Sequence, residues 1–264
     1  MHTSWLAKAS RVFARVRFVI TNEKIKTKGF YKMNKTYSII AALAALFTLP
    51  THANWSATVS GVSDYTFNGV SQTQNDPALQ VGLDKAFDSG LYAGTWASNV
   101  DFGGDTNLEW DFYLGRYQML TETVSVDYGI AYYSYHGASD SSDGNYPELY
   151  TKFGYASDYG ASELNFWYTW DYFGTGAKHA IAMVAHTFQL AKNHALRASL
   201  DVSNSLDSDK WLWQDNETSF YHYRLAYQTS YQGFNIEIAA ENTNLDYNTA
   251  DERVVFGISK TFGF

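Results

Sequence analysis

The chain has 264 residues, with 19 Lys and Arg, 27 Asp and Glu, no Cys, 8 Trp, 21 Tyr and 17 Phe. The absence of Cys excludes a disulfide scaffold and a Cys-based zinc site, and the aromatic fraction of 17% excludes intrinsic disorder. No apolar run reaches the roughly 20 residues that a membrane-spanning helix needs. An aromatic-rich, all-β chain remains.

The N-terminal region divides at Met33. Residues 1–32 carry eight bases and one acid, whereas residues 33–53 run from a short basic start through an apolar stretch to Thr51-His52-Ala53. This order is typical of a secretory signal peptide, which we expect to be cleaved after Ala53. Residues 1–32 are then interpreted as an upstream extension from a mis-assigned start codon. A basic arm that binds nucleic acid is the alternative.

The predicted mature chain, residues 54–264, is strongly acidic. Without the nine bases and one acid that precede it, 10 bases and 26 acids remain, which is a formal charge of −16. Such a field disfavours nucleic acid as a partner and favours cations or other small solutes that are not anionic. Export and the lack of Cys fit the oxidising bacterial envelope.

Apolar and polar residues alternate with a period of two along this part of the chain. For example, Leu108, Trp110, Phe112 and Leu114 alternate with polar residues that include Glu109 and Asp111, which gives an extended strand one apolar and one polar face. Strands of about ten residues suit a tilted membrane crossing. We predict twelve strands, at residues 55–67, 78–87, 91–100, 107–118, 124–136, 147–156, 163–172, 179–190, 194–203, 218–229, 234–244 and 253–264.

The expected connections differ in length by parity. The links after even-numbered strands are short, such as residues 88–90 and 191–193, and most links after odd-numbered strands are longer and more polar, such as residues 68–77 and 204–217. Short periplasmic turns and longer extracellular loops are typical of outer-membrane barrels. The sequence therefore predicts a transmembrane, antiparallel, up-and-down β-barrel of about twelve strands with both termini on the periplasmic side.

The last strand carries a candidate assembly signal. Phe256, Ile258, Phe262 and the terminal Phe264 share one face. This pattern resembles the signal by which the barrel assembly machinery recognises outer-membrane proteins. Lys260 departs from it, although a lysine can extend its ammonium group towards an interface. The predicted partners are this machinery, outer-membrane lipid and lipopolysaccharide, and small solutes or cations.

Two segments of the mature chain resemble a known family. Residues 63–80 (SDYTFNGVSQTQNDPALQ) and 89–102 (SGLYAGTWASNVDF) are similar to the opening of the TorF-type porins, a proteobacterial family long without an assigned function. The resemblance covers the mature chain and is densest in its first fifty residues. It implies an outer-membrane barrel and a pore without an established substrate. Asn68 stands where that family often has Arg.

The polar faces of the strands predict the lining of the barrel, because polar side chains of a membrane barrel point inward. Acids outnumber bases on these faces, which predicts an interior that favours cations. The alternative is that the carboxylates pair with the inward bases and merely fill the interior. The predicted lining residues are Asp84, Glu109, Asp111, Asp127, Glu148, Lys152, Glu163, Asp171, Arg197, Asp201, His222, Arg224, Glu237 and Glu241.

Barrel size and bulky side chains predict a narrow channel. A barrel of eight strands has an interior filled by side chains, and one of sixteen strands has an aqueous channel, so the interior of a twelve-stranded barrel has an intermediate width. Four bulky residues are also expected to point inward: Trp96, Tyr113, Tyr133 and Trp167. Other aromatic residues are assigned to girdles at the membrane edges. These are Trp55, Tyr92, Trp110, Tyr117, Tyr132, Trp170, Tyr172, Tyr221 and Phe264.

Two aromatic residues, Trp211 and Trp213, fall outside the predicted strands. Loop packing is the default interpretation. Contact with lipopolysaccharide, a ligand or the barrel mouth is the alternative.

Two other functional classes stay open. One is a structural or adhesive barrel, and the other is a lipid-modifying enzyme of the outer membrane. The enzyme is disfavoured because the histidines are scattered over several strands and no Gly-x-Ser-x-Gly motif is present. We expect no cofactor and no metal site.

Overall fold

The computed structural model describes residues 55–264. The predicted upstream extension, residues 1–32, and the predicted signal peptide, residues 33–53, lie outside the described residues. Within residues 55–264, no helix has the length and apolar character needed to cross a membrane.

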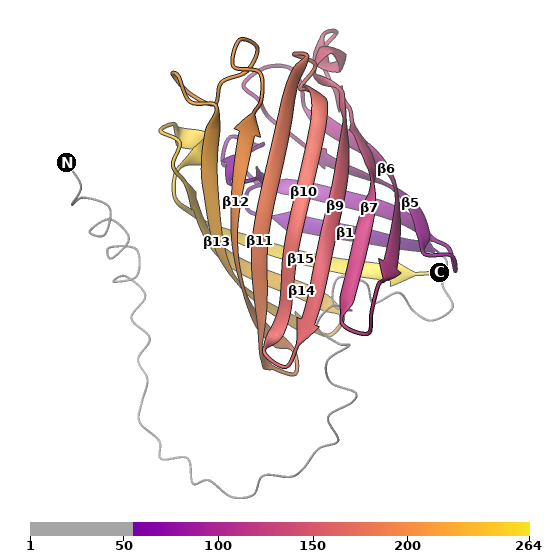
Figure 1. Ribbon diagram of the computed structural model, residues 1–264. Helices are drawn as coiled ribbons and strands as arrows, with labels where there is room; N and C mark the ends of the chain where they lie inside the picture. Colours follow the sequence, from indigo (N-terminus) through magenta and orange to yellow (C-terminus); the bar gives the residue numbers. More distant parts are fainter. Residues whose placement is uncertain (1–54) are drawn as a thin grey trace, which may run out of the picture. The chain divides into compact units, whose positions relative to one another are not determined.

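Almost all of the described chain is β-structure (Figure 1). Two short 3₁₀ helices, η1 (Ser141–Gly144) and η2 (Asn248–Ala250), interrupt it. The strands are β1 (Trp55–Val62), β2 (Thr66–Phe67), β3 (Val70–Ser71), β4 (Ala78–Ala86), β5 (Leu91–Asn99), β6 (Leu108–Met119), β7 (Val124–Tyr133), β8 (Tyr135–His136), β9 (Tyr146–Ser157), β10 (Gly160–Tyr172), β11 (Ala177–Ala191), β12 (His194–Ser205), β13 (Ser219–Tyr231), β14 (Phe234–Thr243) and β15 (Arg253–Gly263).

The long strands form one closed antiparallel barrel. Each pairs with the long strand before and after it, and the ring closes because β1 pairs with both β4 and β15. Trp55 and Phe264 complete this seam with two backbone hydrogen bonds, of 3.2 and 3.0 Å. Closure leaves the ring of long strands, within residues 55–264, without a free edge. The predicted antiparallel barrel of twelve long strands is confirmed.

The two ends of the barrel differ. Tight turns join β4 to β5, β6 to β7, β9 to β10, β11 to β12 and β13 to β14, and we call this the turn end. The turn between β13 and β14 has positive φ at Gln232 (51°) and Gly233 (79°), as a type I′ hairpin requires. The longer connections gather at the other end, the loop end, which lies at the top of Figure 1 for strands β9 to β13.

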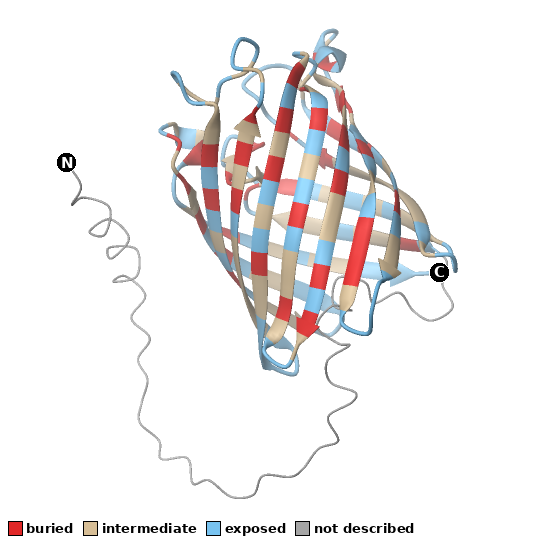
Figure 2. Cartoon of the chain, in the orientation of Figure 1, coloured by how far each residue is buried: buried red, intermediate tan, exposed pale blue. Residues whose placement is uncertain are grey.

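Burial alternates along the strands, as Figure 2 shows for β9 and β10. On β6, Glu109 and Asp111 are buried, whereas Trp110, Phe112 and Leu114 are exposed. Polar groups thus point into the barrel and apolar groups point out, the reverse of a water-soluble protein. An apolar outer surface of this kind suits lipid, not water.

Three local predictions were wrong. The first strand ends at Val62 and not at residue 67, because the chain there turns into the barrel. Tyr92 points inward, where its hydroxyl donates to Asp127. Tyr172 is 1% exposed, because an irregularity in the register with β11 between Thr169 and Tyr172 breaks the alternation. Neither tyrosine belongs to an outer girdle.

Lys260, the exception in the pattern of the last strand, lies over aromatic rings. Its ammonium nitrogen is 4.7 Å from the ring centroid of Phe234 and 5.5 Å from that of Phe262. The cation thus gains two ring contacts beside the turn between β13 and β14. This explains how a lysine is accommodated among apolar neighbours.

Candidate functional site in the barrel interior

The segment that connects β1 to β4 forms a short hairpin, β2–β3, which folds into the barrel interior. Thr66 pairs with Ser71 and Phe67 with Val70. The two-residue turn between them is Asn68-Gly69, with φ of 48° and 79°, and Asn-Gly is a preferred pair for a type I′ turn. The hairpin is therefore encoded locally.

The tip of the hairpin contacts the barrel wall. The Asn68 side chain donates to the Ser203 hydroxyl on β12 at 3.1 Å. A Cβ atom on Gly69 would lie 2.5 Å from the His222 ring and 2.6 Å from the Thr243 methyl. Only glycine satisfies both the positive φ and this close approach.

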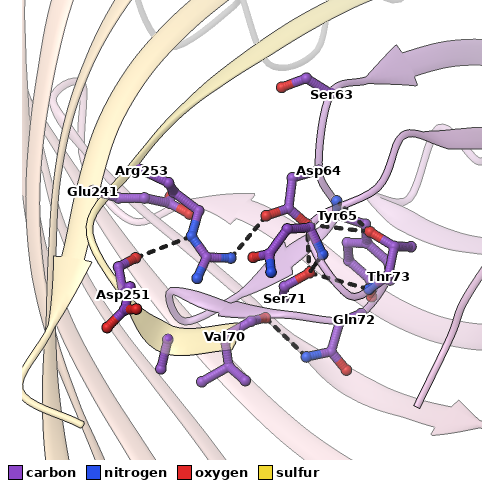
Figure 3. A network of polar contacts seen from close by, with 12 residues as sticks. Ser63, Asp64, Tyr65, Val70, Ser71, Gln72, Thr73, Glu241, Asp251 and Arg253 are labelled. Carbon is purple, nitrogen blue, oxygen red and sulfur yellow. Dashed lines mark hydrogen bonds and ion pairs between the residues drawn. The ribbon is translucent and has the colours of Figure 1, made fainter. Parts of the chain in front are cut away.

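The base of the hairpin is held by Asp64 (Figure 3). One Asp64 oxygen accepts hydrogen bonds from Ser71 at 2.6 Å and Thr73 at 3.1 Å, and the other accepts one from Arg253 of β15 at 2.7 Å. Both members of the ion pair are largely buried, with side chains 8% and 11% exposed. Asp64 thus joins the start of the segment to its return strand and to the barrel wall.

The hairpin reaches another part of the wall as well. The Tyr65 ring packs edge-on against Trp96 of β5 at 5.3 Å, and its hydroxyl interacts with Glu109 of β6. Thr66 interacts with Glu241 of β14. Because these contacts involve strands on both sides of β1, the hairpin crosses the interior.

The hairpin separates two cavities. A cavity of about 640 Å³ is lined by Phe67, Val70 and loop residues, whereas a cavity of about 220 Å³ is lined by Tyr65, Thr66 and inward residues of β4, β5 and β13–β15. Thr66 and Phe67 are adjacent and point to opposite sides of the hairpin. The hairpin therefore lies between these two cavities.

One part of the wall carries five inward carboxylates, which we call the acidic wall: Asp84, Glu109, Asp111, Asp127 and Glu148. They lie on β4, β6, β7 and β9. None of the five forms an ion pair with another described residue.

Tyrosine hydroxyls are the main partners of the acidic wall. Tyr92 donates to Asp127 at 2.6 Å, Tyr133 donates to Glu148 at 2.9 Å, and Tyr135 donates to Glu109 at 3.4 Å. Tyr113 donates to Asp84. A tyrosine hydroxyl that donates to a carboxylate brings no compensating positive charge to this wall.

Three carboxylate oxygens of the acidic wall have no hydrogen-bond partner among residues 55–264. They are Glu109 Oε2, Asp111 Oδ1 and Glu148 Oε2, all of them buried. Lys152 lies opposite Asp127 in the β7–β9 register, but its ammonium group rests over the rings of Tyr150 at 4.9 Å and Trp167 at 5.8 Å. A single base thus lies among these acids.

The remaining inward charges form a second group, the paired wall, on β10 and β12–β14. Its members are Glu163, Arg197, Asp201, His222, Arg224, Glu237 and Glu241. Arg197 bonds Glu163 at 2.6 Å, and Arg224 bonds Glu237 at 2.7 Å and Glu241 at 2.8 Å. His222 bonds Asp201 at 2.7 Å. Here every acid contacts an arginine or a histidine.

Asp171 belongs to neither wall. It lies at the end of β10, where its carboxylate accepts the backbone N–H of Gly176 at 2.7 Å and so supports the connection to β11. Trp211 and Trp213 pack on Tyr172 at the loop end, with ring centroids 5.0 and 5.7 Å away.

The sequence reasoning missed the hairpin and its clamp. Asn68-Gly69 between two short β-prone segments is a hairpin signal that could have been found. The ion pair between Asp64 and Arg253 could not have been found, because no local pattern indicates that these distant residues meet. The tyrosine partners of the acidic wall also emerge only from the folded structure.

Two serine–histidine contacts test the enzymatic alternative. Ser162 lies 2.9 Å from His186 Nδ1, and Ser134 lies 3.1 Å from His136 Nε2. Neither histidine has a carboxylate partner among the described residues, so a third group that would orient the base is missing. Residues 55–264 also contain no group of three His, Asp or Glu arranged to hold a metal ion.

The fold resembles solved structures of porins. The KdgM porin matches with a TM-score of 0.54 at 9% identity, over 78% of this chain and 99% of that one. The NanC porin matches with a TM-score of 0.55 at 12% identity, over 79% of this chain and 99% of that one. KdgM in complex with disordered oligogalacturonate matches similarly, with a TM-score of 0.53 at 8% identity. At such identities the likeness shows a shared barrel fold.

Sequence comparison places the chain in a family. No curated protein matches it significantly. The model of one bacterial family, described as proteins of unknown function, matches residues 50–262 and thus covers every strand of the barrel except the last residue of β15. The chain therefore belongs to this family, Gcw_chp.

Proposed function

We propose that this protein is an outer-membrane channel of narrow bore that favours cations or small cationic solutes. The closed barrel, its apolar outer surface and its fold likeness to the KdgM and NanC porins support a pore. The resemblance of residues 63–80 and 89–102 to TorF-type porins supports the same assignment.

The acidic wall is the observation that carries the cation preference. Four of its five carboxylates accept hydrogen bonds from tyrosine hydroxyls, while the bases of the interior are largely used by the paired wall. Low-dielectric walls focus the field of such charges on the interior, as carboxylate rings do in cation channels. The oligogalacturonate named with KdgM is a polyanion, and the acidic wall argues for a different solute here.

The hairpin β2–β3 supports a narrow bore. It crosses the interior and divides the described cavities. Twelve strands alone leave limited space once inward aromatic residues such as Trp96 and Trp167 are present. Ions and small solutes therefore suit the channel better than large ones.

We also propose the expected location and partners. The turn end would face the periplasm and the loop end the outside, in contact with lipid and lipopolysaccharide. The signal peptide would direct export, and the last strand would be recognised by the barrel assembly machinery. The role is transport and not catalysis, because neither serine–histidine contact is completed by a carboxylate.

The test is a reversal potential in a planar bilayer. The refolded chain from Asn54 to Phe264 is reconstituted with a KCl gradient, and the sign of the potential at zero current is measured. A cation-selective channel is expected, with a preference that weakens towards 1 M salt, where the Debye length falls to about 3 Å. An anion-selective channel contradicts the proposal.

A structural or adhesive barrel is the second candidate, because the hairpin fills part of the interior. This candidate predicts no unitary current from properly folded protein. The same bilayer measurement therefore separates the two.

A further inference from the structure

The larger cavity, of about 640 Å³, lies between the hairpin and the loops and has an aromatic wall. We call it the aromatic vestibule. Its rings come from separate parts of the chain: the connection after β5, strand β8, the end of β10 and the connection after β12. They are Phe102, Tyr135, Tyr172, Phe173, Trp211 and Trp213.

Some rings of the vestibule stand nearly perpendicular to one another, whereas Phe173 is stacked on Trp211 at 10° and on Tyr135 at 18°. Tyr172 and Trp211 have centroids 5.0 Å apart at 85°, and Trp211 and Trp213 have centroids 5.7 Å apart at 83°. The Trp213 ring packs edge-on against Phe220, with ring centroids 4.5 Å apart. Packed rings at several mutual angles thus line the cavity and give it an aromatic surface.

The charge of the lining is one-sided. Asp140 is the only charged residue among those that line the vestibule, and neither Lys nor Arg is present in that lining. The Asp140 carboxylate forms no ion pair with the described residues. Burial raises the pKa of Tyr247, another lining residue, to about 12, so its hydroxyl stays neutral.

We propose that the aromatic vestibule binds an organic cation with an alkylated ammonium group. The face of an aromatic ring attracts a cation, and recognition of quaternary ammonium by several rings is an established use of this interaction. Asp140 adds a compensating charge, and the volume lies in the range of small-molecule sites. This inference rests on the proposed function and deepens it, because it names the class of cation that enters the channel.

The hairpin connects the vestibule with the acidic wall. Phe67, Val70 and Gln72 of the hairpin segment line the vestibule, whereas Tyr65 on its other side interacts with Glu109. A cation that leaves the aromatic rings would therefore next meet the acidic wall. A small inorganic cation lacks the apolar surface that rings bind well, and an anion would meet no Lys or Arg in this lining and would be repelled by Asp140.

Calorimetric titration of the refolded barrel with choline tests binding directly. The matched control ligand is 3,3-dimethylbutan-1-ol, in which carbon replaces the charged nitrogen. We expect choline to bind at least about tenfold more tightly, since only the cation gains from the ring faces and Asp140. Equal binding of both compounds, or tighter binding of glucose, would overturn the proposal.

Variants locate the site. Trp211→Leu keeps an apolar side chain but removes the π face, and we expect it to weaken choline binding about tenfold. Asp140→Asn changes an exposed residue that does not support the fold, and we expect a loss of about threefold. The control is Trp170→Leu, whose ring faces outward. Unchanged binding in Asp140→Asn and in folded Trp211→Leu would overturn the assignment.

The two proposals fail in different ways. If the channel is cation-selective in KCl but choline gives no heat, the vestibule inference is wrong and the channel stands. If choline binds but the folded barrel passes no current, the channel is wrong and a closed barrel with a ligand site at its mouth remains.

Discussion

Asp64 and Arg253 are 189 positions apart in the sequence, yet their side chains form an ion pair of 2.7 Å inside the barrel. The pair joins the segment that enters the interior to β15, one of the two strands at the seam where the barrel closes. A single buried contact thus couples the position of the hairpin to the wall.

Replacing Arg253 with Gln should loosen the hairpin. The substitution leaves the buried Asp64 carboxylate without its cationic partner, which costs about 3 kcal/mol for a pair of this burial. We expect a lower midpoint of urea unfolding and a higher, noisier single-channel conductance. Lys260→Gln, on the same strand but outside the barrel, is the control and should leave the conductance unchanged. Equal conductance in both variants would show that the clamp does not restrict the channel.

Replacing Gly69 with Ala should displace the hairpin tip from the wall. The new Cβ would lie 2.5 Å from the His222 ring at a φ of +79°. Gly103 has nearly the same φ, +81°, but nothing lies within 4 Å of its Cβ position. Both substitutions carry a backbone cost of about 1 kcal/mol, and only Gly69→Ala adds a packing clash of about 1–3 kcal/mol.

The measurements for the glycine pair are the unfolding midpoint and the conductance. Gly69→Ala should unfold at lower urea concentration than Gly103→Ala and should pass more current. If the two variants behave alike, the contact between the hairpin and β13 is not part of the constriction.

Neutralising Glu109 and Asp111 together should reduce the cation preference. The two residues are two positions apart on β6 and both point inward, so Glu109→Gln with Asp111→Asn removes two charges from one stripe. We expect the reversal potential to move towards zero. Asp88→Asn with Glu122→Gln removes the same charge from exposed turns, and this control should keep the preference. A shift of equal size in the control would place the selectivity outside the acidic wall.

Deleting Phe264 should reduce assembly of the barrel into the membrane but leave export intact. The deletion removes the proposed recognition residue together with the two backbone hydrogen bonds to Trp55 at the seam. Phe264→Tyr keeps both the aromatic ring and the backbone and is the control. The yield of the heat-modifiable folded form in the outer-membrane fraction is the measurement. Normal yield from the deleted chain would show that the terminal aromatic residue is not the signal.

The repeated alternation of apolar and polar residues was sufficient to predict the barrel. Each strand encodes its own two faces. On β6, the apolar Leu108 and Leu114 could therefore be assigned outward, and Glu109 and Asp111 inward, without knowledge of any partner strand. Loop lengths added the order of turns and loops. These properties are local, and local patterns can be read from a sequence.

The contents of the interior depend on contacts between distant segments. Tyr172 was assigned to the outer surface, but an irregularity in the register with β11 turns it inward. Tyr92 was also assigned outward, although it shares a face of β5 with the inward Trp96, so that alternation alone places it towards Asp127. Which carboxylates meet Arg224 and which meet only tyrosines depends on the order of strands around the ring. The sequence by itself therefore determined a barrel with an acidic lining. Only the tertiary structure decided that the acids separate into two walls and that a hairpin clamped by Asp64 and Arg253 lies between them, because burial and charge pairing are set by neighbours far away along the chain.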